Sequence, residues 1–351
     1  MADHRRPPSL ADVARDAAVS LATASRALDP ASTHPISDAT RQRVHAVASR
    51  LGYQPNPMAR GLRTQRLGTL AVVVHDISDP YFAEVVRGAA GAASDAGLPT
   101  IVCSSERTPA LELKNLQMLR QMRVAGILFA GSGITDPNHE RKVAALVREI
   151  GSYGGAVVAL APRSERWPAE VCDNRGGAVA AARHLVELGH RQIAIVSGPP
   201  QVRASMERVA GYRDVLSKVG IDAPMVAAEF NYETGQQAAA ELLTRDLPFT
   251  AVLAANDAMA MGVMAEFRRR KVRVPDEVSL VGFGDIPGAS YLFPSLTTVR
   301  VPAARLGIAG VRRSLELLSG VSRLPRVRVH PVELVVREST GVPCRETGLS
   351  R

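Results

Sequence analysis

The feature that most constrains the fold is an alternation that repeats along the chain after residue 67. Short, continuous apolar runs rich in Val, Ile and Ala are separated by longer stretches with helical periodicity. Strands that are apolar throughout are typical of parallel sheets whose two faces are both covered by helices. Because the runs fall into two sets, we predict an α/β core of two doubly wound parallel sheets, with strands at residues 70–76, 100–105, 126–131, 156–162, 192–198, 251–257, 278–285 and 297–301.

Polar residues stand at the ends of several of these runs. In open α/β sheets, ligands bind beyond the carboxyl ends of the strands, so these positions predict a ligand pocket. The alternative interpretation is that they are ordinary strand ends, which are often polar. The positions concerned are 76–78, 104–105, 197–198, 256–257 and 284–285.

Length and composition limit the class of protein. A chain of 351 residues is too long for one ordinary core, and its 46% hydrophobic and 22% charged residues are typical of a globular protein. No apolar run approaches 18 residues, and the first ten residues lack an apolar segment after their basic ones, so we expect neither a membrane span nor a secretory signal. Three widely separated cysteines favour a reducing cytoplasm and no metal site, and we expect no cofactor.

The positive charge is concentrated at the N-terminus. Residues 1–66 contain ten arginines and five aspartates, with no lysine or glutamate, and so carry +5 of the formal net charge of +9. A basic module of this size is typical of a partner that carries many negative charges, such as DNA. The alternative is a solvated basic arm without a partner.

The same N-terminal stretch predicts three short helices. Residues from Leu10 to Leu28 form two amphipathic segments separated at Ala17–Ala18, with Ser20 as the N-cap of the second, and a third helix begins at Ser37 and ends at Gly52. The second helix leaves small, hydrogen-bonding and cationic side chains on its outer face, which suit base edges and phosphates. Alanine-rich helix pairs also occur as plain structural elements, so this pattern alone leaves the function open.

Motifs along nearly the whole chain resemble the LacI/GalR (lactose/galactose-repressor) family of bacterial transcriptional regulators. The first is "LADVARDAAVSLATASRAL", which is followed by "ISDATRQRV" and "LGYQPNPMARGLRT". The later ones include "DPYFAEVVRGAAGAASDAG", "DNRGGAVAAARHLVELGHRQIAIVSGP", "MERVAGYRD" and "PSLTTVR". The resemblance implies a repressor that binds a palindromic double-stranded DNA operator as a homodimer and responds to a small-molecule effector, which we expect to be a sugar, a sugar acid or a related metabolite.

The resemblance assigns roles in DNA binding to individual residues. On the recognition helix, Ser20, Thr23 and Arg26 match family positions that contact DNA, and Leu21 and Ala22 match two that vary with the operator. The residues that match phosphate-contacting or backbone-positioning sites are Ser9, Ser37, Thr40, Tyr53 and Asn56.

A hinge helix is implied for residues 57–66, directly after the helix-turn-helix domain at 1–56. In the family this segment folds on the operator and enters the minor groove, where Leu62 would act as a wedge that partly unstacks one base step. Ala59 lies one turn earlier on the same face, and Arg60 and Arg63 flank the wedge, where they can neutralise phosphates. The alternative for Leu62 is an ordinary linker leucine.

Two departures from the family pattern occur in the N-terminal module. Ala18 stands where the family usually has a turn glycine, and a left-handed alanine there would be strained. The loop at 29–37 is about two residues longer than the pattern leads us to expect, so no DNA contact is transferred to His34.

The resemblance also implies an effector-binding and dimerisation domain at 67–340, similar to periplasmic sugar-binding proteins. We expect one lobe at about 67–165 and 300–326, a second at about 166–299 and 327–340, and a tail at 341–351. Arg208 and Asn256 would bond the ligand, and Phe230 would stack on it, although Arg208 could instead form an ion pair and Phe230 could belong to the core. The full set of predicted effector-binding residues is Tyr81, Phe82, Ser104, Arg163, Arg208, Phe230, Asn256 and Asp285.

Two substitutions bear on the effector. Gly284 and Pro162 stand where sugar-binding members often have aspartates, whose carboxylates accept hydrogen bonds from sugar hydroxyls. We therefore hypothesise an effector that is not a neutral sugar held in the common way but is acidic or larger, with Arg163 and Arg208 favouring an anion. Tight calorimetric binding of a neutral hexose would contradict this hypothesis.

Other classes of protein fit the sequence less well. The chain has no GxxxxGK, HExxH or GxSxG motif, so we expect no enzyme. A pure ligand-binding protein would have no use for the first 66 residues, and a nonspecific nucleoid protein would not need a large pocketed core. The basic run at 266–275 ends a predicted helix and is interpreted as a solvated face. We expect a cytoplasmic, nucleoid-associated regulator; induction and corepression remain open.

Overall fold

The computed structural model describes residues 8–29, 34–53, 67–163, 167–245, 248–321 and 325–344. It divides the chain into two compact units, Met1–Gly68 and Thr69–Arg351. Within the described ranges, every helix is too short or too polar to cross a membrane.

The first unit contains three helices, α1 (Leu10–Asp16), α2 (Leu21–Ala27) and α3 (Asp38–Leu51). Their core is built from small side chains, which allow the short helices to cross closely: Val13, Ala14, Ala17, Ala24, Ala27, Val44, Val47 and Ala48. Ser20 caps α2 and the left-handed Gly52 caps α3, as predicted. Ala18 has a φ of 50°, so the expected left-handed alanine is present in the turn between α1 and α2.

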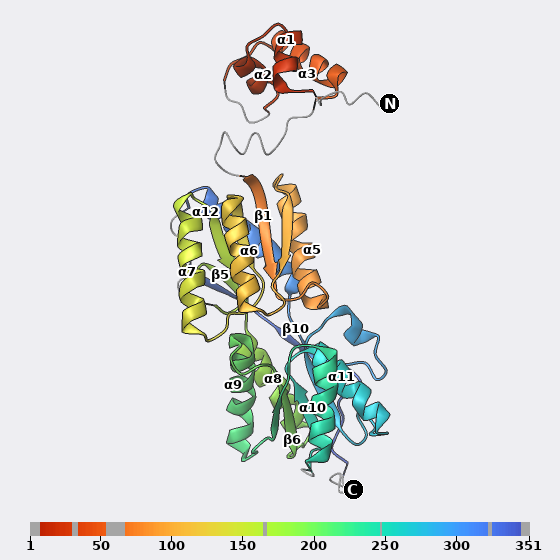
Figure 1. The fold of residues 1–351 in the computed structure, drawn as a ribbon. Helices are drawn as coiled ribbons and strands as arrows, with labels where there is room; N and C mark the ends of the chain where they lie inside the picture. Colours follow the sequence, from red (N-terminus) through yellow and green to blue (C-terminus); the bar gives the residue numbers. More distant parts are fainter. Residues whose placement is uncertain are drawn as a thin grey trace, which may run out of the picture. The chain divides into compact units, whose positions relative to one another are not determined.

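The second unit consists of two lobes, each a six-stranded sheet covered by helices on both faces (Figure 1). In lobe 1 the strand order is β11-β5-β4-β3-β1-β2, and all pairs described are parallel. Its strands are β1 (Leu67–Val74), β2 (Thr100–Ser104), β3 (Val124–Phe129), β4 (Ala156–Ala159), β5 (Ala169–Cys172) and β11 (Val327–His330). Helices α5 (Pro80–Asp95) and α12 (Ala303–Leu318) cover one face, and α6 (Pro109–Gln121) and α7 (Pro137–Ser152) cover the other.

Lobe 2 repeats this plan with the order β12-β10-β9-β8-β6-β7, in which only β12 runs antiparallel to its neighbour. Its strands are β6 (Ile193–Ser197), β7 (Met225–Ala227), β8 (Ala251–Ala254), β9 (Ser279–Gly284), β10 (Thr297–Arg300) and β12 (Glu333–Val335). One face carries α8 (Asn174–Glu187) and α9 (Arg203–Leu216), and the other carries α10 (Tyr232–Thr244) and α11 (Asp257–Arg269). Two short 3₁₀ helices lie at Ser217–Val219 and Pro287–Ser290.

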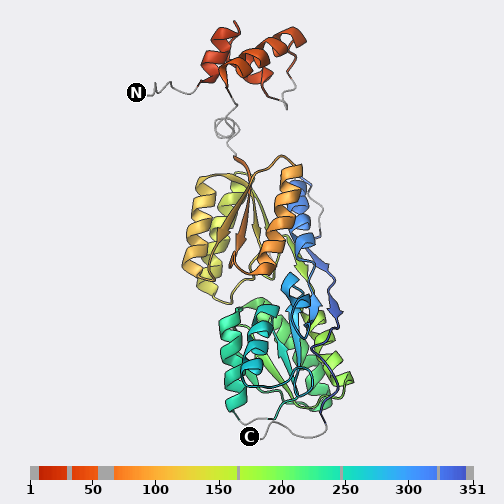
Figure 2. The ribbon, with the colours of Figure 1, turned by 90° about the vertical axis from the view of Figure 1, so that its right-hand side faces the viewer.

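The chain crosses between the lobes three times, after β5, after β10 and after β11 (Figure 2). The predicted lobe boundaries at 166 and 327 are therefore wrong by a few residues, because β5 and β11 pair with each other in lobe 1. The predicted tail also starts inside the folded unit, since the Gly341 carbonyl accepts a hydrogen bond from His190 Nε2 at 2.9 Å.

Lobe 1 depends on a close approach of α5 and α12. A Cβ atom on Gly307 would lie 2.2 Å from the Val85 carbonyl oxygen, and one on Gly88 would lie 2.0 Å from the Ala304 carbonyl oxygen. No other residue type fits either position without moving one helix away from the other.

Candidate functional site: a recognition helix and an interlobe cavity

Helix α2 presents the outer face that was predicted for DNA recognition. Ala24 and Ala27 are buried in the three-helix core, whereas Leu21, Ala22 and Arg26 are exposed, Leu21 by 55% of its surface. Thr23 is half-buried, and its hydroxyl lies 2.8 Å from that of Ser20. A leucine exposed beside an arginine on a short helix is a surface suited to thymine methyl groups and phosphates.

Three residues that were predicted to contact DNA, Ser9, Ser20 and Ser37, are helix N-caps. The Ser9, Ser20 and Ser37 hydroxyls accept hydrogen bonds from the backbone N–H groups of Asp12, Thr23 and Thr40. The Ser9 hydroxyl also donates to Asp12 Oδ2 at 2.6 Å, which completes a capping box. Ser20 and Ser37 therefore combine a positive helix end with a hydroxyl, which suits a phosphate, whereas at Ser9 the Asp12 carboxylate already occupies that place.

The remaining predicted DNA contacts lie at or beyond the end of α3. Tyr53 is half-buried against the core of the unit. Asn56, Ala59, Arg60, Leu62 and Arg63 lie outside the described residues.

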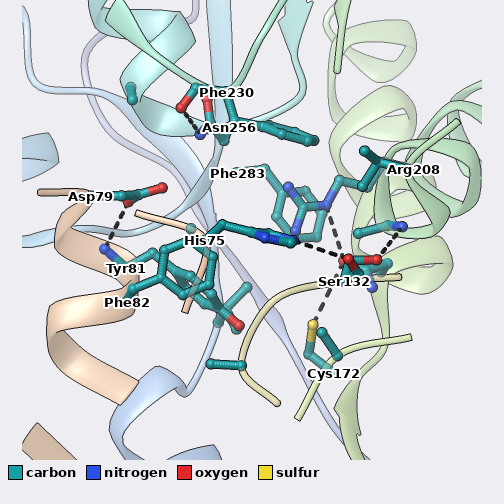
Figure 3. A pocket seen from close by; sticks show the side chains of 18 of the residues that line it. His75, Asp79, Tyr81, Phe82, Ser132, Cys172, Arg208, Phe230, Asn256 and Phe283 are labelled. Atoms are coloured by element: carbon teal, nitrogen blue, oxygen red, sulfur yellow. Dashed lines mark hydrogen bonds between the residues drawn. The ribbon is translucent and has the colours of Figure 1, made fainter. Parts of the chain in front are cut away.

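A cavity of about 720 Å³, part of it open to solvent, lies between the lobes of the second unit. Five of the eight predicted effector-binding residues line it: Tyr81, Phe82, Arg208, Phe230 and Asn256. Figure 3 shows Tyr81 and Phe82 from α5 on one side of the cavity and Phe230 and Asn256 on another, with Arg208 beside Phe283. Of the polar strand ends predicted to form a pocket, Asn256, Asp257 and Gly284 line this cavity.

Arg208 is held in place by contacts within lobe 2. Its Nε donates to Asn174 Oδ1 at 2.9 Å, and its Nη1 donates to the Ala255 carbonyl at 2.5 Å. The guanidinium stacks on Phe283, 3.9 Å from the ring centroid. These contacts fix the plane of the guanidinium and leave Nη2 available to a ligand.

Asn256 and Phe230 form another wall. Asn256 caps α11 by accepting from the Met259 N–H at 2.9 Å, and its amide nitrogen donates to the Phe230 carbonyl at 3.5 Å, which leaves the second amide hydrogen for a ligand. Phe230 packs against Gly198, where a Cβ atom would lie 2.2 Å from the ring. Gly198 directly follows β6, and because it has no side chain, the Phe230 ring fits against its backbone.

Lobe 1 contributes a neutral histidine to the cavity. His75 Nε2 lies 2.9 Å from the Ser132 carbonyl, which it can meet only as a donor. Burial, together with the charges of Arg163 and Arg107, lowers the pKa of His75 to about 4. The ring is therefore uncharged at neutral pH and serves as a fixed hydrogen-bonding wall.

The structure corrects the interpretation of Arg163. Its Nη1 and Nη2 donate to the Glu112 carboxylate at 3.0 and 2.5 Å, and its Nε donates to the Gly131 carbonyl at 2.9 Å. Although burial raises the pKa of Glu112, Arg163 and the hydrogen bond from His139 hold that pKa well below its usual range. Arg163 therefore does have an opposing carboxylate, and it lies outside the cavity lining.

Two further predicted residues also lie outside the cavity lining. The Ser104 hydroxyl donates to the His75 carbonyl at 3.1 Å and faces an adjoining hollow. Asp285 follows β9 with a φ of 53°, which turns its side chain away to accept from Arg300 at 2.7 Å and from Arg337 at 2.6 Å. Strand-end position alone did not show which way these side chains point.

Gly284 borders the cavity beside a buried acid. Burial raises the pKa of Asp257 to about 6, against hydrogen bonds from the Thr298 hydroxyl and the Ile286 N–H. Gly284 has a φ of 143°, and a Cβ atom there would lie 3.2 Å from Asp257 Oδ2. A second carboxylate at this position would meet the first, which explains why the local structure suits glycine.

Several cavity residues were not predicted from the sequence. They are Asn174 and Phe283, which hold Arg208, and His75, Asp79 and Arg107 on the side of lobe 1. The signal available was position: Phe283 lies in β9 and His75 directly follows β1, at the carboxyl edges of the two sheets. Within the described ranges, the His, Cys, Asp and Glu side chains form no cluster that could hold a metal ion.

A helix-turn-helix unit joined to a two-lobed core with an interlobe cavity defines the class of ligand-responsive DNA-binding regulators. A model of bacterial regulatory proteins of the lacI family matches residues 9–56, and a model of a periplasmic binding protein-like domain matches residues 182–340. The HTH-type transcriptional regulator DegA of Bacillus subtilis (strain 168) is 33% identical over 334 residues, covering 94% of this chain and 97% of DegA. The HTH-type transcriptional repressor CytR of Escherichia coli (strain K12) is 31% identical over 337 residues, covering 95% and 96%.

Solved structures of similar proteins show the same architecture. A lac repressor dimer bound to operator and the anti-inducer ONPF matches with a TM-score of 0.85 at 27% identity, covering 96% of this chain and 100% of that chain. A complex of the regulator CelR with cellobiose matches with a TM-score of 0.69 at 30% identity, covering 95% and 99%. The chain belongs to the LacI family of bacterial regulatory proteins, and it is a DNA-binding transcriptional regulator.

Proposed function

We propose that the protein is a repressor that binds a palindromic operator as a homodimer and is controlled by a small molecule in the interlobe cavity. The observation that carries this proposal is the combination, in one chain, of an exposed recognition helix and a cavity with polar and aromatic walls from both lobes. The lac repressor dimer bound to operator and the CelR–cellobiose complex support it by similarity. Such a regulator acts by binding, not by catalysis, on DNA in the cytoplasm.

A dimer is needed because one three-helix module offers few base contacts. Two modules on a two-fold axis read two half-sites, which explains the expected palindrome. Lobe 2 carries two aromatic side chains that are almost fully exposed, Tyr291 at 86% and Phe293 at 94%. Adjacent exposed aromatic rings are typical of a protein interface, and we assign them to contact with a second copy.

The cavity would control DNA binding through lobe closure. Walls from both lobes contact the same ligand, so binding favours one relative position of the lobes, and the segment at 57–66 would respond. The coupling needed is modest, about 1–3 kcal/mol, and reciprocal. In that segment we retain the predicted wedge: Leu62→Ala should weaken operator binding and leave ligand binding unchanged.

The decisive experiment selects bound fragments of genomic DNA with the purified full chain. We expect a palindrome with a flexible pyrimidine–purine step at its centre. Arg26→Ala should lose affinity and base preference, whereas Arg63→Ala should weaken binding to all sequences alike and reduce the salt dependence. Absence of an enriched palindrome, with and without cell extract as a source of ligand, would contradict the proposal.

The same operator distinguishes the two regulatory modes. Ligand that lowers operator affinity is an inducer, and ligand that raises it is a corepressor. Fluorescence anisotropy of a labelled operator, measured at fixed salt with the full chain, shows directly whether the ligand raises or lowers operator affinity.

A further inference from the structure

Arg107 is a cavity residue with an unusual backbone. It lies between β2 and α6 in lobe 1, and both Glu106 and Arg107 are left-handed, with φ values of 49° and 54°. Neither residue is glycine, so two consecutive residues of this kind carry a conformational cost that the surrounding structure must hold in place. This backbone directs the arginine side chain to the cavity wall.

The Arg107 guanidinium lacks good acceptors. Its Nε is buried and has no hydrogen-bond partner in the described part of the chain. The Asp79 carboxylate is 3.8 Å from Nη2, well beyond the usual length of a charge-assisted hydrogen bond of about 2.7–2.9 Å. The guanidinium carbon lies 5.5 Å from the centroid of the Phe230 ring, which belongs to lobe 2. The largely buried guanidinium of Arg107 in lobe 1 thus reaches toward lobe 2.

The opposite wall also offers mainly donors. Arg208 Nη2 and the second hydrogen of the Asn256 amide nitrogen remain as donors, the first amide hydrogen being directed at the Phe230 carbonyl. Of the two acidic lining residues, Asp257 directs both oxygens at groups of its own lobe, the Thr298 hydroxyl and the Ile286 N–H. Asp79 is then the one carboxylate among the lining residues that faces the two arginines.

We propose that the ligand of this cavity is a small organic acid whose carboxylate is bound between Arg107 of lobe 1 and Arg208 of lobe 2. Its apolar part would lie among the rings of Tyr81, Phe82 and Phe230. This inference rests on the proposed effector role of the cavity. It gives lobe closure a physical cause, since one anion brings together two cations that belong to different lobes.

The test compares acids with their neutral counterparts on the full chain by thermal shift and then calorimetry. The probes are D-glucuronate and D-gluconate against D-glucose, and 4-hydroxybenzoate against 4-hydroxybenzamide. We expect at least one acid to bind roughly tenfold or more tightly than its neutral counterpart. Arg107→Gln should weaken that acid by roughly 10- to 100-fold, the usual effect of losing hydrogen bonds to a charged group, and should leave the neutral compound unchanged.

Two matched variants complete the design. Arg245→Gln removes a surface arginine of lobe 2, paired with Glu241, and should bind the acid like the wild type. Arg107→Lys keeps the positive charge but loses the planar, two-pronged guanidinium, so it should lose less affinity for the acid than Arg107→Gln. If Arg107→Gln fails to fold, Arg107→Lys still tests the role of the guanidinium.

The proposal is overturned if no acid binds, if the neutral compounds bind more tightly, or if both Arg107 variants bind the acid like the wild type. Operator affinity is measured in the same samples. An acid that requires Arg107 but leaves operator affinity unchanged supports the anion clamp and contradicts the regulatory role, so the two proposals fail separately.

Discussion

Removing the Glu112 carboxylate should strongly destabilise lobe 1, because it would leave Arg163 as a buried charge without a partner. The two side chains form a bidentate pair and are each only 6% exposed. Glu112 also accepts from His139 Nε2 at 3.1 Å, so it satisfies two buried groups. Breaking a buried pair from one side typically costs about 3–5 kcal/mol, and we expect Glu112→Leu to lower the free energy of unfolding by that amount.

The double variant Glu112→Leu/Arg163→Met separates charge from packing. It removes both charges, and such replacements are often nearly neutral. It still loses two contacts of Arg163. The guanidinium carbon lies 4.3 Å from the centroid of the Phe129 ring, and Nε donates to the Gly131 carbonyl. We therefore expect the free energy of unfolding to fall by roughly 1–2 kcal/mol. The double variant should therefore be more stable than the single one.

Urea unfolding followed by tryptophan fluorescence suits this measurement. The chain has one tryptophan, Trp167, which is buried in lobe 1 with its ring centroid 5.2 Å from that of Phe129. The signal thus comes from the surroundings of the ion pair. If Glu112→Leu proves as stable as the double variant, Arg163 is not a buried charge that depends on Glu112, and the reasoning fails.

Three other predictions concern stability and assembly. Gly307→Ala should cost about 1–3 kcal/mol through overlap with the Val85 carbonyl, whereas Gly151→Ala, whose Cβ would meet open space, should be neutral or slightly stabilising in the same urea assay. Because burial lowers the pKa of His75 to about 4, the unfolded chain binds more protons between that pH and about 6.5. Stability should therefore fall as the pH drops through this window, by at most about 3 kcal/mol, and acid titration of His75→Gln should show a smaller loss. Tyr291→Ser combined with Phe293→Ser should shift sedimentation toward the monomer, and an unchanged dimer would contradict the assigned interface.

The strands that are continuously apolar could be predicted from the sequence, and the short strands that contain polar or charged residues could not. The eight continuous apolar runs all became strands, because burial on both sheet faces demands continuous hydrophobic residues. The strands that were missed, β5, β7, β11 and β12, have three or four residues each, and most of them lie at sheet edges. Strands β7, β11 and β12 are partly exposed, and β5 contains the charged Glu170, so periodicity does not distinguish these segments from loops.

The site likewise contains residues that could be predicted from the sequence and residues that could not. Tyr81, Phe82 and Arg208 were placed from matching motifs, and the structure brings them to one cavity. The partner of Arg163 could not be predicted, because Glu112 lies 51 residues away and only the packing of α6 against the sheet brings the two together. Arg107 was missed because its direction depends on a left-handed backbone at two residues that carry side chains.

The three crossings between the lobes have a consequence for biosynthesis. Strand β1 ends at Val74, but α12, which packs beside α5 on the same sheet face, begins only at Ala303. At about 5–20 residues per second, a ribosome needs roughly 10–50 s to make the intervening chain. During that time α5 alone can cover this apolar face of lobe 1, while α1, α2 and α3 have already been made in full. The nascent protein therefore acquires its DNA-binding unit first and completes its ligand-binding core only near the end of translation.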